Sequence, residues 1–261
     1  MNIDVCLETV FTDQPVERRI ELIAQIGYPQ VEFWMTSGKD PVSIRQACAA
    51  AGVTMNDFVV NGPDGPFNPI QEGNLRNYLD QVETCIAFGE QMGCRKMITC
   101  SGNLQPGKTR AEMRATLEKA LGEAAAVAEK HGFTLLLEVL NTHVDHAGYY
   151  LDSSQEGAEI VRAINSPGLK LLYDIYHMQI MEGNLIANIE RHLDVIGHFH
   201  SAGVPGRHEL FTGEIYYPAI LERIVAGGYT GSFGLEYMPA MADHAESLRK
   251  TLDYLTAKPV C

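Results

Sequence analysis

Short apolar runs alternate with longer amphipathic segments along the whole chain. The first run, IDVCL, precedes a segment with apolar residues at helical spacing that ends at Gly27, a residue typical of helix C-termini. The same pair of patterns then repeats. We expect strands at 3–7, 30–34, 53–58, 96–100, 134–139, 169–175, 195–200 and 232–237. The helices expected between and after them cover 15–27, 41–52, 74–92, 110–131, 154–164, 184–193, 217–226 and 245–255.

This alternation predicts an α/β fold with a parallel sheet. Continuous apolar runs indicate strands buried on both faces, and intervening helices supply right-handed crossovers. About eight such units in 261 residues match a closed (β/α)8 TIM barrel, which we expect as a single domain over 1–261. A doubly wound open sheet is the alternative, but it usually opens with a glycine-rich phosphate turn, and none follows the first run.

Composition narrows the class of protein. The chain is 46% hydrophobic and 20% charged, with neither a run of about 18 apolar residues nor the pattern of a signal peptide, so we expect a cytoplasmic protein. Its formal charge of −13 argues against nucleic acid and anionic membranes as partners. The cysteines lack disulfide or zinc-finger spacing, which predicts free buried thiols at Cys6, Cys48, Cys85, Cys94, Cys100 and Cys261.

Polar residues close the last four predicted strands. The run LLLEVLN ends its apolar stretch in Glu138, and the next three strands end near Asp174, His200 and Glu236. Active sites of (β/α)8 barrels lie at the C-terminal ends of the strands, so these side chains should converge. Three crowded carboxylates repel one another unless a cation neutralises them. Three oxygen donors and one imidazole predict a site for Mn²⁺, Mg²⁺ or Co²⁺, and Zn²⁺ also accepts this set.

Further polar residues follow the same strands. His143 and His146 are spaced for a separate metal site, although a loop position makes this the weaker interpretation. His198 lies two residues before His200 and so faces the same side one layer deeper, where a hydrogen-bonded core histidine is expected. Arg207 offers a bidentate clamp for a carboxylate or phosphate, or is an exposed loop residue. The other polar residues near this mouth are Asn141, Asp145, His177, His208 and Glu209.

Three longer motifs resemble the hydroxypyruvate isomerase family of xylose isomerase-like barrels. They are YDIYHMQIMEGNL (173–185), IGHFHSAGVPGRHELFTGEIYY (196–217) and GLEYMP (234–239). The resemblance implies a metal held by Glu138, Asp174, His200 and Glu236. It further implies that Glu138 and Glu236 act as the acid-base pair, and that a homodimer or homotetramer forms. Residues expected to contact the substrate, by family position or by place at the mouth, are His177, Arg207, Asn141 and His143.

The resemblance leads us to expect a metal-dependent isomerase of hydroxypyruvate or small sugars that works through an enediolate. EVLN (138–141) is closer to ketose 3-epimerases, such as those for D-tagatose and D-psicose, although Val144 stands where those enzymes usually place a second glutamate. C3 epimerisation is therefore the alternative activity. A DNA-processing nuclease of the same superfamily would need more histidine ligands and a basic surface. A sugar-binding barrel without turnover is the non-enzymatic alternative.

Overall fold

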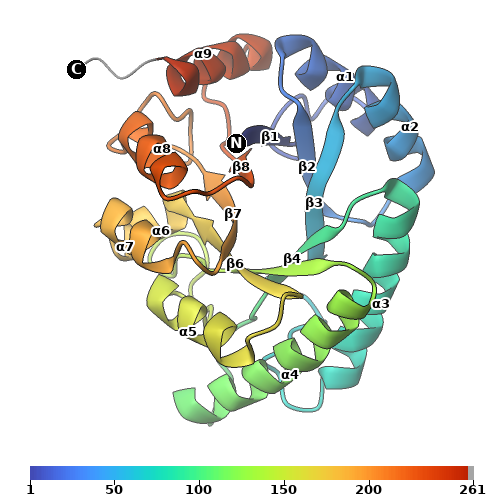
Figure 1. The fold of residues 1–261 in the computed structure, drawn as a ribbon, viewed down its shortest axis with the longest axis vertical. Helices are drawn as coiled ribbons and strands as arrows, with labels where there is room; N and C mark the ends of the chain where they lie inside the picture. The colour runs from blue at the N-terminus through green and yellow to red at the C-terminus, as the bar shows by residue number, and fades with distance from the viewer. Residues whose placement is uncertain (258–261) are drawn as a thin grey trace.

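The computed structural model, which describes residues 1–257, is a closed barrel of eight parallel strands (Figure 1). Each strand pairs with its sequence neighbours and β1 pairs with β8, so the open sheet is excluded. The strands are β1 Asn2–Cys6, β2 Gln30–Met35, β3 Thr54–Asn61, β4 Lys96–Cys100, β5 Thr134–Glu138, β6 Leu169–Asp174, β7 Ile196–Ser201 and β8 Ser232–Leu235. The predicted barrel is confirmed.

Helices surround the barrel and cover its outer face (Figure 1). In residues 1–257 they are α1 Val16–Ile26, α2 Pro41–Ala51, α3 Leu75–Met92, α4 Arg110–Lys130, α5 Ser154–Ile164, α6 Ile175–Met181, α7 Leu185–His192, α8 Tyr217–Ala226 and α9 His244–Thr256. Local sequence explains several of their ends. Thr109 and Glu112 form a capping box at the start of α4, and Gly27 adopts a left-handed conformation (φ 115°) after α1.

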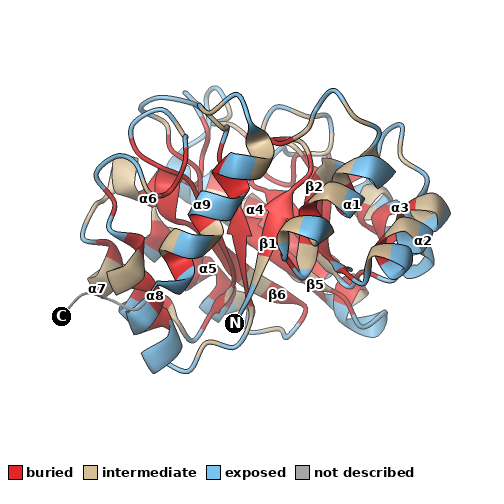
Figure 2. Ribbon diagram, turned by 90° about the horizontal axis from the view of Figure 1, so that it is seen from above, coloured by how far each residue is buried: buried red, intermediate tan, exposed pale blue. Residues whose placement is uncertain are grey.

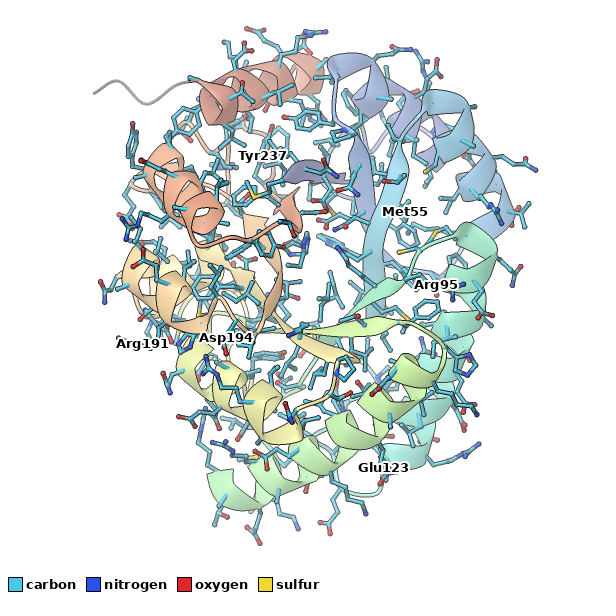
Figure 3. All side chains as sticks on the ribbon, in the orientation of Figure 1. Met55, Arg95, Glu123, Arg191, Asp194 and Tyr237 are labelled. Carbon is cyan, nitrogen blue, oxygen red and sulfur yellow. The ribbon has the colours of Figure 1, made fainter. Side chains whose placement is uncertain are left out.

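The main apolar core lies between the strands and the helices. Figure 2 shows buried residues along the strands and on the inner faces of the helices, while the outer helical faces are exposed. In Figure 3, Glu123 of α4 and Arg191 of α7 lie on this outer rim. A second, small apolar cluster is separate from this core and is formed by one residue from each of β3, β4, β5 and β6, namely Val59, Ile98, Leu136 and Leu172. Rigid strands packed in this way hold the residues at their C-terminal ends in place.

Two elements differ from the sequence-based expectation. Helix α6 was not predicted, because it begins at Ile175, directly after the last residue of β6, with no turn residue to mark the change. Strand β3 continues to Asn61 rather than ending at 58, since Val59 and Val60 extend its apolar run. The first difference matters for the site, because it turns the residues after Asp174 back over the barrel mouth.

The state of the cysteines and the length and polarity of the helices match what the composition predicts. Five cysteines are buried and unpaired in the described part of the chain, namely Cys6, Cys48, Cys85, Cys94 and Cys100, whereas Cys261 lies outside it. Within residues 1–257, every helix is too short or too polar to cross a lipid bilayer.

Candidate metal centre and active site

The strand-end residues predicted to bind a metal converge at the C-terminal mouth of the barrel. Glu138 and Asp174 are the last residues of β5 and β6, His200 lies in β7, and Glu236 directly follows β8. Strand register aligns them, because Asp174 pairs with His200, and His200 pairs with Gly234, two residues before Glu236. All four side chains are buried. One ligand atom from each lies within 4.8 Å of the others.

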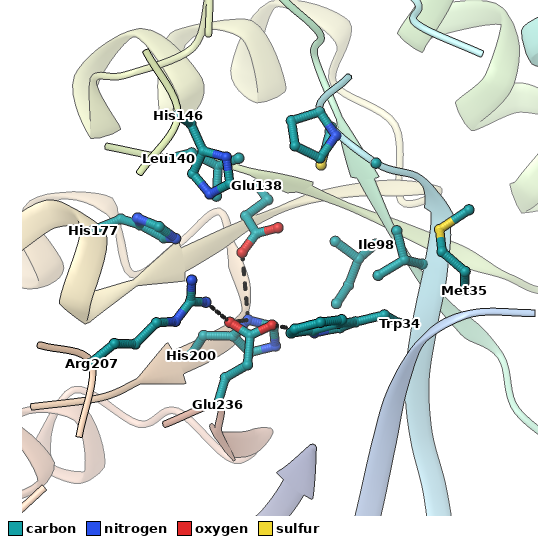
Figure 4. Close-up of a pocket in the computed structure, with 14 residues that line it drawn as sticks. Trp34, Met35, Ile98, Glu138, Leu140, His146, His177, His200, Arg207 and Glu236 are labelled. Atoms are coloured by element: carbon teal, nitrogen blue, oxygen red, sulfur yellow. Dashed lines mark hydrogen bonds and ion pairs between the residues drawn. The ribbon is translucent and has the colours of Figure 1, made fainter. Parts of the chain in front are cut away.

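The imidazole of His200 shows that this arrangement suits a cation. Its Nδ1 lies 3.5 Å from Glu138 Oε1 and 3.4 Å from Glu236 Oε2, yet it is buried without a hydrogen-bond partner. Figure 4 shows the two glutamates reaching toward this ring from opposite sides. An imidazole nitrogen and three carboxylates around one point form a donor set for a divalent ion, which would displace any proton on that nitrogen. The residues therefore fit the metal that the sequence predicts.

Glu236 is held by two further side chains. Trp34 Nε1 donates a hydrogen bond to Glu236 Oε1 (2.6 Å), and Arg207 forms an ion pair with Oε2 (Figure 4). Burial favours the protonated acid, but the charges of Arg207 and His200 outweigh burial and hold the pKa of Glu236 well below its usual range. Trp34, the only tryptophan, was not predicted; its position near the end of β2 is the sequence signal that could have indicated it.

Arg207 lines the cavity at the barrel mouth and is not an exposed loop residue. Its backbone is left-handed (φ 57°), and its carbonyl oxygen accepts a hydrogen bond from Met238 N (2.7 Å), which joins the loop after β7 to the loop after β8. Its guanidinium lies over the ring of Tyr176, 5.2 Å from the centroid, and 4.0 Å from Asp174 Oδ2. Strained backbone of this kind concentrates at functional sites.

Asp174 has a structural contact as well as a place among the candidate ligands. Its Oδ1 accepts a hydrogen bond from His177 N (3.1 Å) and so caps the N-terminus of α6. Burial raises the pKa of Asp174 to about 7, an effect that the charge of Arg207 opposes and that of Glu236 reinforces. A bound cation would hold this carboxylate ionised.

His177 is a neutral hydrogen-bond donor with a determined tautomer. Its Nδ1 accepts from the backbone N–H of Asn141 (3.2 Å) and lies 2.7 Å from Asn141 Nδ2, so the ring proton is on Nε2. Burial, with the nearby charge of Arg207, holds the pKa of His177 well below its usual range. Nε2 has no hydrogen-bond partner and lies 3.5 Å from Asp174 Oδ2. The structure thus directs one donor toward the site.

The site residues described above, except Asp174, line a cavity of about 240 Å³. In Figure 4, His177 and Arg207 lie on one side of the cavity, and the apolar side chains of Ile98 and Met35 lie on the other. Asn141, which is buried behind His177, and His143, which is exposed, are both described and lie outside this lining. The lining is Trp34, Met35, Val59, Gly62, Pro63, Ile98, Cys100, Glu138, Leu140, His146, His177, His200, Arg207 and Glu236.

A second buried polar cluster lies deeper in the barrel. Three carboxylate oxygens surround His198 Nε2, from Glu32 at 3.2 Å, Asp57 at 3.3 Å and Asp4 at 3.6 Å. His198 is fully buried and hydrogen-bonded, as expected from its spacing. The three acids were not predicted. Each interrupts an apolar strand (IDVCL, VTMNDF, QVEFW), and this is the same signal that drew attention to Glu138.

Donors within the protein satisfy much of this deeper cluster. Asn56 Nδ2 donates to Asp57 Oδ2 (2.7 Å) and to Asp4 Oδ2 (3.0 Å), and Lys96 Nζ donates to Asn56 Oδ1 (3.0 Å). Burial, together with the charge of Glu32, raises the pKa of Asp4 to about 8. The oxygen of Asp57 that contacts His198 already accepts this hydrogen bond from Asn56, which leaves it less free to bind a cation. In residues 1–257, the mouth is therefore the better metal site of the two groups of metal-capable side chains, and neither group includes His143 or His146.

A family model for the xylose isomerase-like TIM barrel matches residues 20–258, most of the chain. The chain belongs to this family. A putative hydroxypyruvate isomerase of Homo sapiens is 30% identical over 232 residues, which cover 85% of this chain and 83% of that protein. A 2-oxo-tetronate isomerase of Cupriavidus necator is 29% identical, with 89% and 91% covered. These relatives confirm the predicted resemblance and the isomerase class.

Solved structures agree on the fold. A protein of Brucella melitensis described as AP endonuclease, family 2, superposes with a TM-score of 0.90 at 28% identity, covering 97% of this chain and 99% of that one. A D-psicose 3-epimerase of Clostridium cellulolyticum H10 superposes with a TM-score of 0.85 over 98% of each chain, at 20% identity. At that identity the likeness to the epimerase is one of fold alone.

Proposed function

We propose that this protein is a metal-dependent isomerase of small 2-hydroxy-carbonyl compounds, with hydroxypyruvate and small sugars as the substrate class. One observation carries the proposal: Glu138, Asp174, His200 and Glu236 surround one point at the mouth of the barrel, beside a cavity of about 240 Å³. These four residues would hold a divalent ion, with Mn²⁺, Mg²⁺ or Co²⁺ the expected choices. When bound, such an ion stabilises negative charge on the two oxygens of the substrate.

The residues of the chain supply the proton transfers. Isomerisation removes a proton from one carbon and returns it to its neighbour through an enediolate. Glu138 and Glu236 approach from opposite sides of the cavity, so they can exchange protons with different positions of the substrate (Figure 4). Glu236 already accepts from Trp34 and pairs with Arg207, which weakens its basicity. Glu138 is therefore the better candidate to remove the first proton.

His177 and Arg207 would bind substrate oxygens. The Nε2–H of His177 lies at the cavity as a neutral donor, and Arg207 can exchange part of its pairing with Glu236 for an anionic group of the substrate. The 240 Å³ cavity and its apolar far side favour a short substrate over an oligosaccharide. Asn141 would act behind His177, and His143 remains a proposed contact only for a substrate that extends out of the cavity.

The decisive experiment is a panel of C3 to C6 hydroxy-carbonyl compounds, assayed in D₂O by NMR with Mn²⁺, Mg²⁺ or Co²⁺. We expect solvent deuterium to enter a substrate carbon and a new aldehyde or ketone to form. A ketose inverted at C3 would instead identify a 3-epimerase, the alternative function. No deuterium in any compound, together with no stoichiometric metal in the purified protein, would point to a binding protein without turnover.

Glu236→Gln provides the matched variant for this assay. The substitution keeps the size of the side chain and its contact with Trp34 but removes a charge and a proton acceptor. We expect turnover to fall by roughly 1,000-fold or more, because both proton transfer and charge stabilisation are lost. The melting temperature without metal should stay close to that of the wild type. Turnover retained in this variant would contradict the assigned role.

A further inference from the structure

Glu32 links the deeper cluster to the candidate metal centre. It lies in β2, across the barrel from β7, and its carboxylate is 2% exposed. One of its oxygens, Oε2, is 3.2 Å from His198 Nε2 and also 3.2 Å from His200 Nε2. A single carboxylate oxygen therefore contacts two imidazole rings on the same strand. The contact with His200 is on the opposite side of the ring from Nδ1, the atom that faces Glu138 and Glu236.

Hydrogen-bond chemistry decides the proton position at His200. An ionised carboxylate oxygen only accepts hydrogen bonds, so Nε2, the ring nitrogen that is hydrogen-bonded to Glu32 at 3.2 Å, must carry a proton, whereas Nδ1 makes no hydrogen bond to the more distant Glu138 and Glu236. With the proton on Nε2, the lone pair of neutral His200 is on Nδ1. This is the nitrogen at the predicted metal position, and it has no other partner. The opposite tautomer would place two lone pairs against each other at Glu32 and turn an N–H toward the metal.

Packing holds the ring in this orientation. A Cβ added at Gly234 of β8 would lie 2.8 Å from His200 Cδ2 and 3.0 Å from His198 Nε2, so only glycine leaves room for the two rings there. The rings of His198 and His200 pack edge to face, with centroids 5.0 Å apart. Rotation of the His200 ring is therefore restricted by its neighbours. Its tautomer, in contrast, depends on the acceptor at Nε2.

We propose that Glu32 is the positioning residue of the metal centre, and that it keeps the proton of His200 on Nε2 so that Nδ1 is free to bind the ion. The inference rests on the proposed function, since it assumes a metal at the mouth. It adds a residue of β2 that supports the candidate ligands, which themselves come from β5, β6, β7 and the residue after β8. Carboxylates behind a ligating imidazole also raise its basicity, and removing them typically weakens metal binding about 10- to 100-fold.

Metal affinity of three variants tests the proposal. Glu32→Leu removes the acceptor, Glu32→Gln keeps a carbonyl oxygen that can accept, and Asp57→Asn changes a neighbouring buried acid that contacts His198 but not His200. We expect Mn²⁺ titration to show about 10- to 100-fold weaker binding for Glu32→Leu, a smaller loss for Glu32→Gln, and affinity within about 3-fold of wild type for Asp57→Asn. Equal weakening in Glu32→Leu and Asp57→Asn would overturn the specific role of Glu32.

The tautomer gives a readout that a purely structural role would not affect. Long-range ¹H–¹⁵N spectra of wild-type protein with ring-labelled histidine should show His200 protonated at Nε2 when Mg²⁺ is bound. A proton on Nδ1 would overturn the proposal even if Glu32→Leu failed to fold. The outcomes also separate the two hypotheses. Metal that binds wild type and Glu32→Leu equally contradicts the role of Glu32 alone, whereas a wild type that binds no Mn²⁺ contradicts the proposed function and this inference with it.

Discussion

Glu138 and Glu236 are identical side chains in one cavity, but their surroundings give them different chemistry. Glu236 accepts from Trp34 and pairs with Arg207, while Glu138 approaches His200 Nδ1 without such partners. The charges of Arg207 and His200 and the hydrogen bond from Trp34 stabilise the ionised form of Glu236 and so make it a poorer proton acceptor. The different roles proposed for Glu138 and Glu236 in proton transfer therefore depend on Trp34 as well as on the two acids.

Trp34→Phe should show this dependence. Phenylalanine keeps a ring at the cavity wall but cannot donate to Glu236 Oε1, and a hydrogen bond to a charged group contributes roughly 1.5–3 kcal/mol. We expect kcat/KM to fall at least about 10-fold with an unchanged far-ultraviolet spectrum. Met35→Leu, at a neighbouring wall position without that contact, should keep activity within about 2-fold. A Trp34→Phe enzyme as active as Met35→Leu would contradict the role of the indole N–H.

The sequence predicted the polar residues at the barrel mouth more completely than the polar residues buried beneath it. Glu138, Asp174, His200 and Glu236 could be predicted because each closes a strand, and the barrel brings strand ends together. Trp34 was missed because its contact with Glu236 joins β2 to the end of β8, a pairing that no local pattern encodes. The acids around His198 were missed because an acid inside an apolar strand has no assigned partner until the barrel closes.

The junction of β6 and α6 combines a candidate metal ligand and a helix cap in one residue, Asp174. Asp174 ends the strand and accepts from His177 N, so the helix starts at the next residue. Periodicity predicted the strand correctly but extended it to 175, because Ile175 and Tyr176 are apolar and continue its pattern. Only the capping contact reveals that the chain changes direction there. This direction places His177 at the cavity.

Two substitutions separate the two roles of Asp174. Asparagine caps helices as well as aspartate does, whereas alanine does not, so Asp174→Ala should be about 1 kcal/mol less stable than Asp174→Asn in urea unfolding without metal. Both variants lose the charged ligand and should bind Mn²⁺ at least about 10-fold more weakly than wild type. Equal unfolding free energies would show that the cap contributes nothing. If Asp174→Asn bound Mn²⁺ as tightly as the wild type, Asp174 would not be a metal ligand.

The barrel has acidic side chains buried in its interior as well as exposed on its surface. The formal charge is −13, and several carboxylates are buried, among them Asp4, Glu32 and Asp57 beneath the mouth. Composition gives the net charge but could not predict these buried acids, because their burial depends on which strand faces point inward. Such a core should make stability depend on pH. The homodimer or homotetramer stays a prediction that light scattering can test.

Asp4→Asn tests how the interior charge affects the stability of the barrel. The folded pKa of about 8 lies above the unfolded value of 3.8, so the folded state retains the proton more strongly. The stability from this group is complete below the unfolded pKa and is lost as pH rises to about 8. Asparagine keeps an acceptor for Asn56 and never ionises. Relative to wild type, the variant should therefore gain unfolding free energy between pH 5 and pH 8, on the order of a few kcal/mol.

Urea unfolding at pH 5, 6.5 and 8, in the presence of a chelator, measures this difference. Asp13→Asn is the matched control, because Asp13 is exposed and, within residues 1–257, its carboxylate accepts a side-chain hydrogen bond only from its neighbour Gln14. We expect this variant to follow the wild-type dependence of stability on pH, because substitutions of exposed residues away from such buried groups change stability little. If Asp4→Asn followed the wild type as well, the proton would not reside on Asp4, and Asp57, whose pKa burial also raises, would be the acid to substitute next.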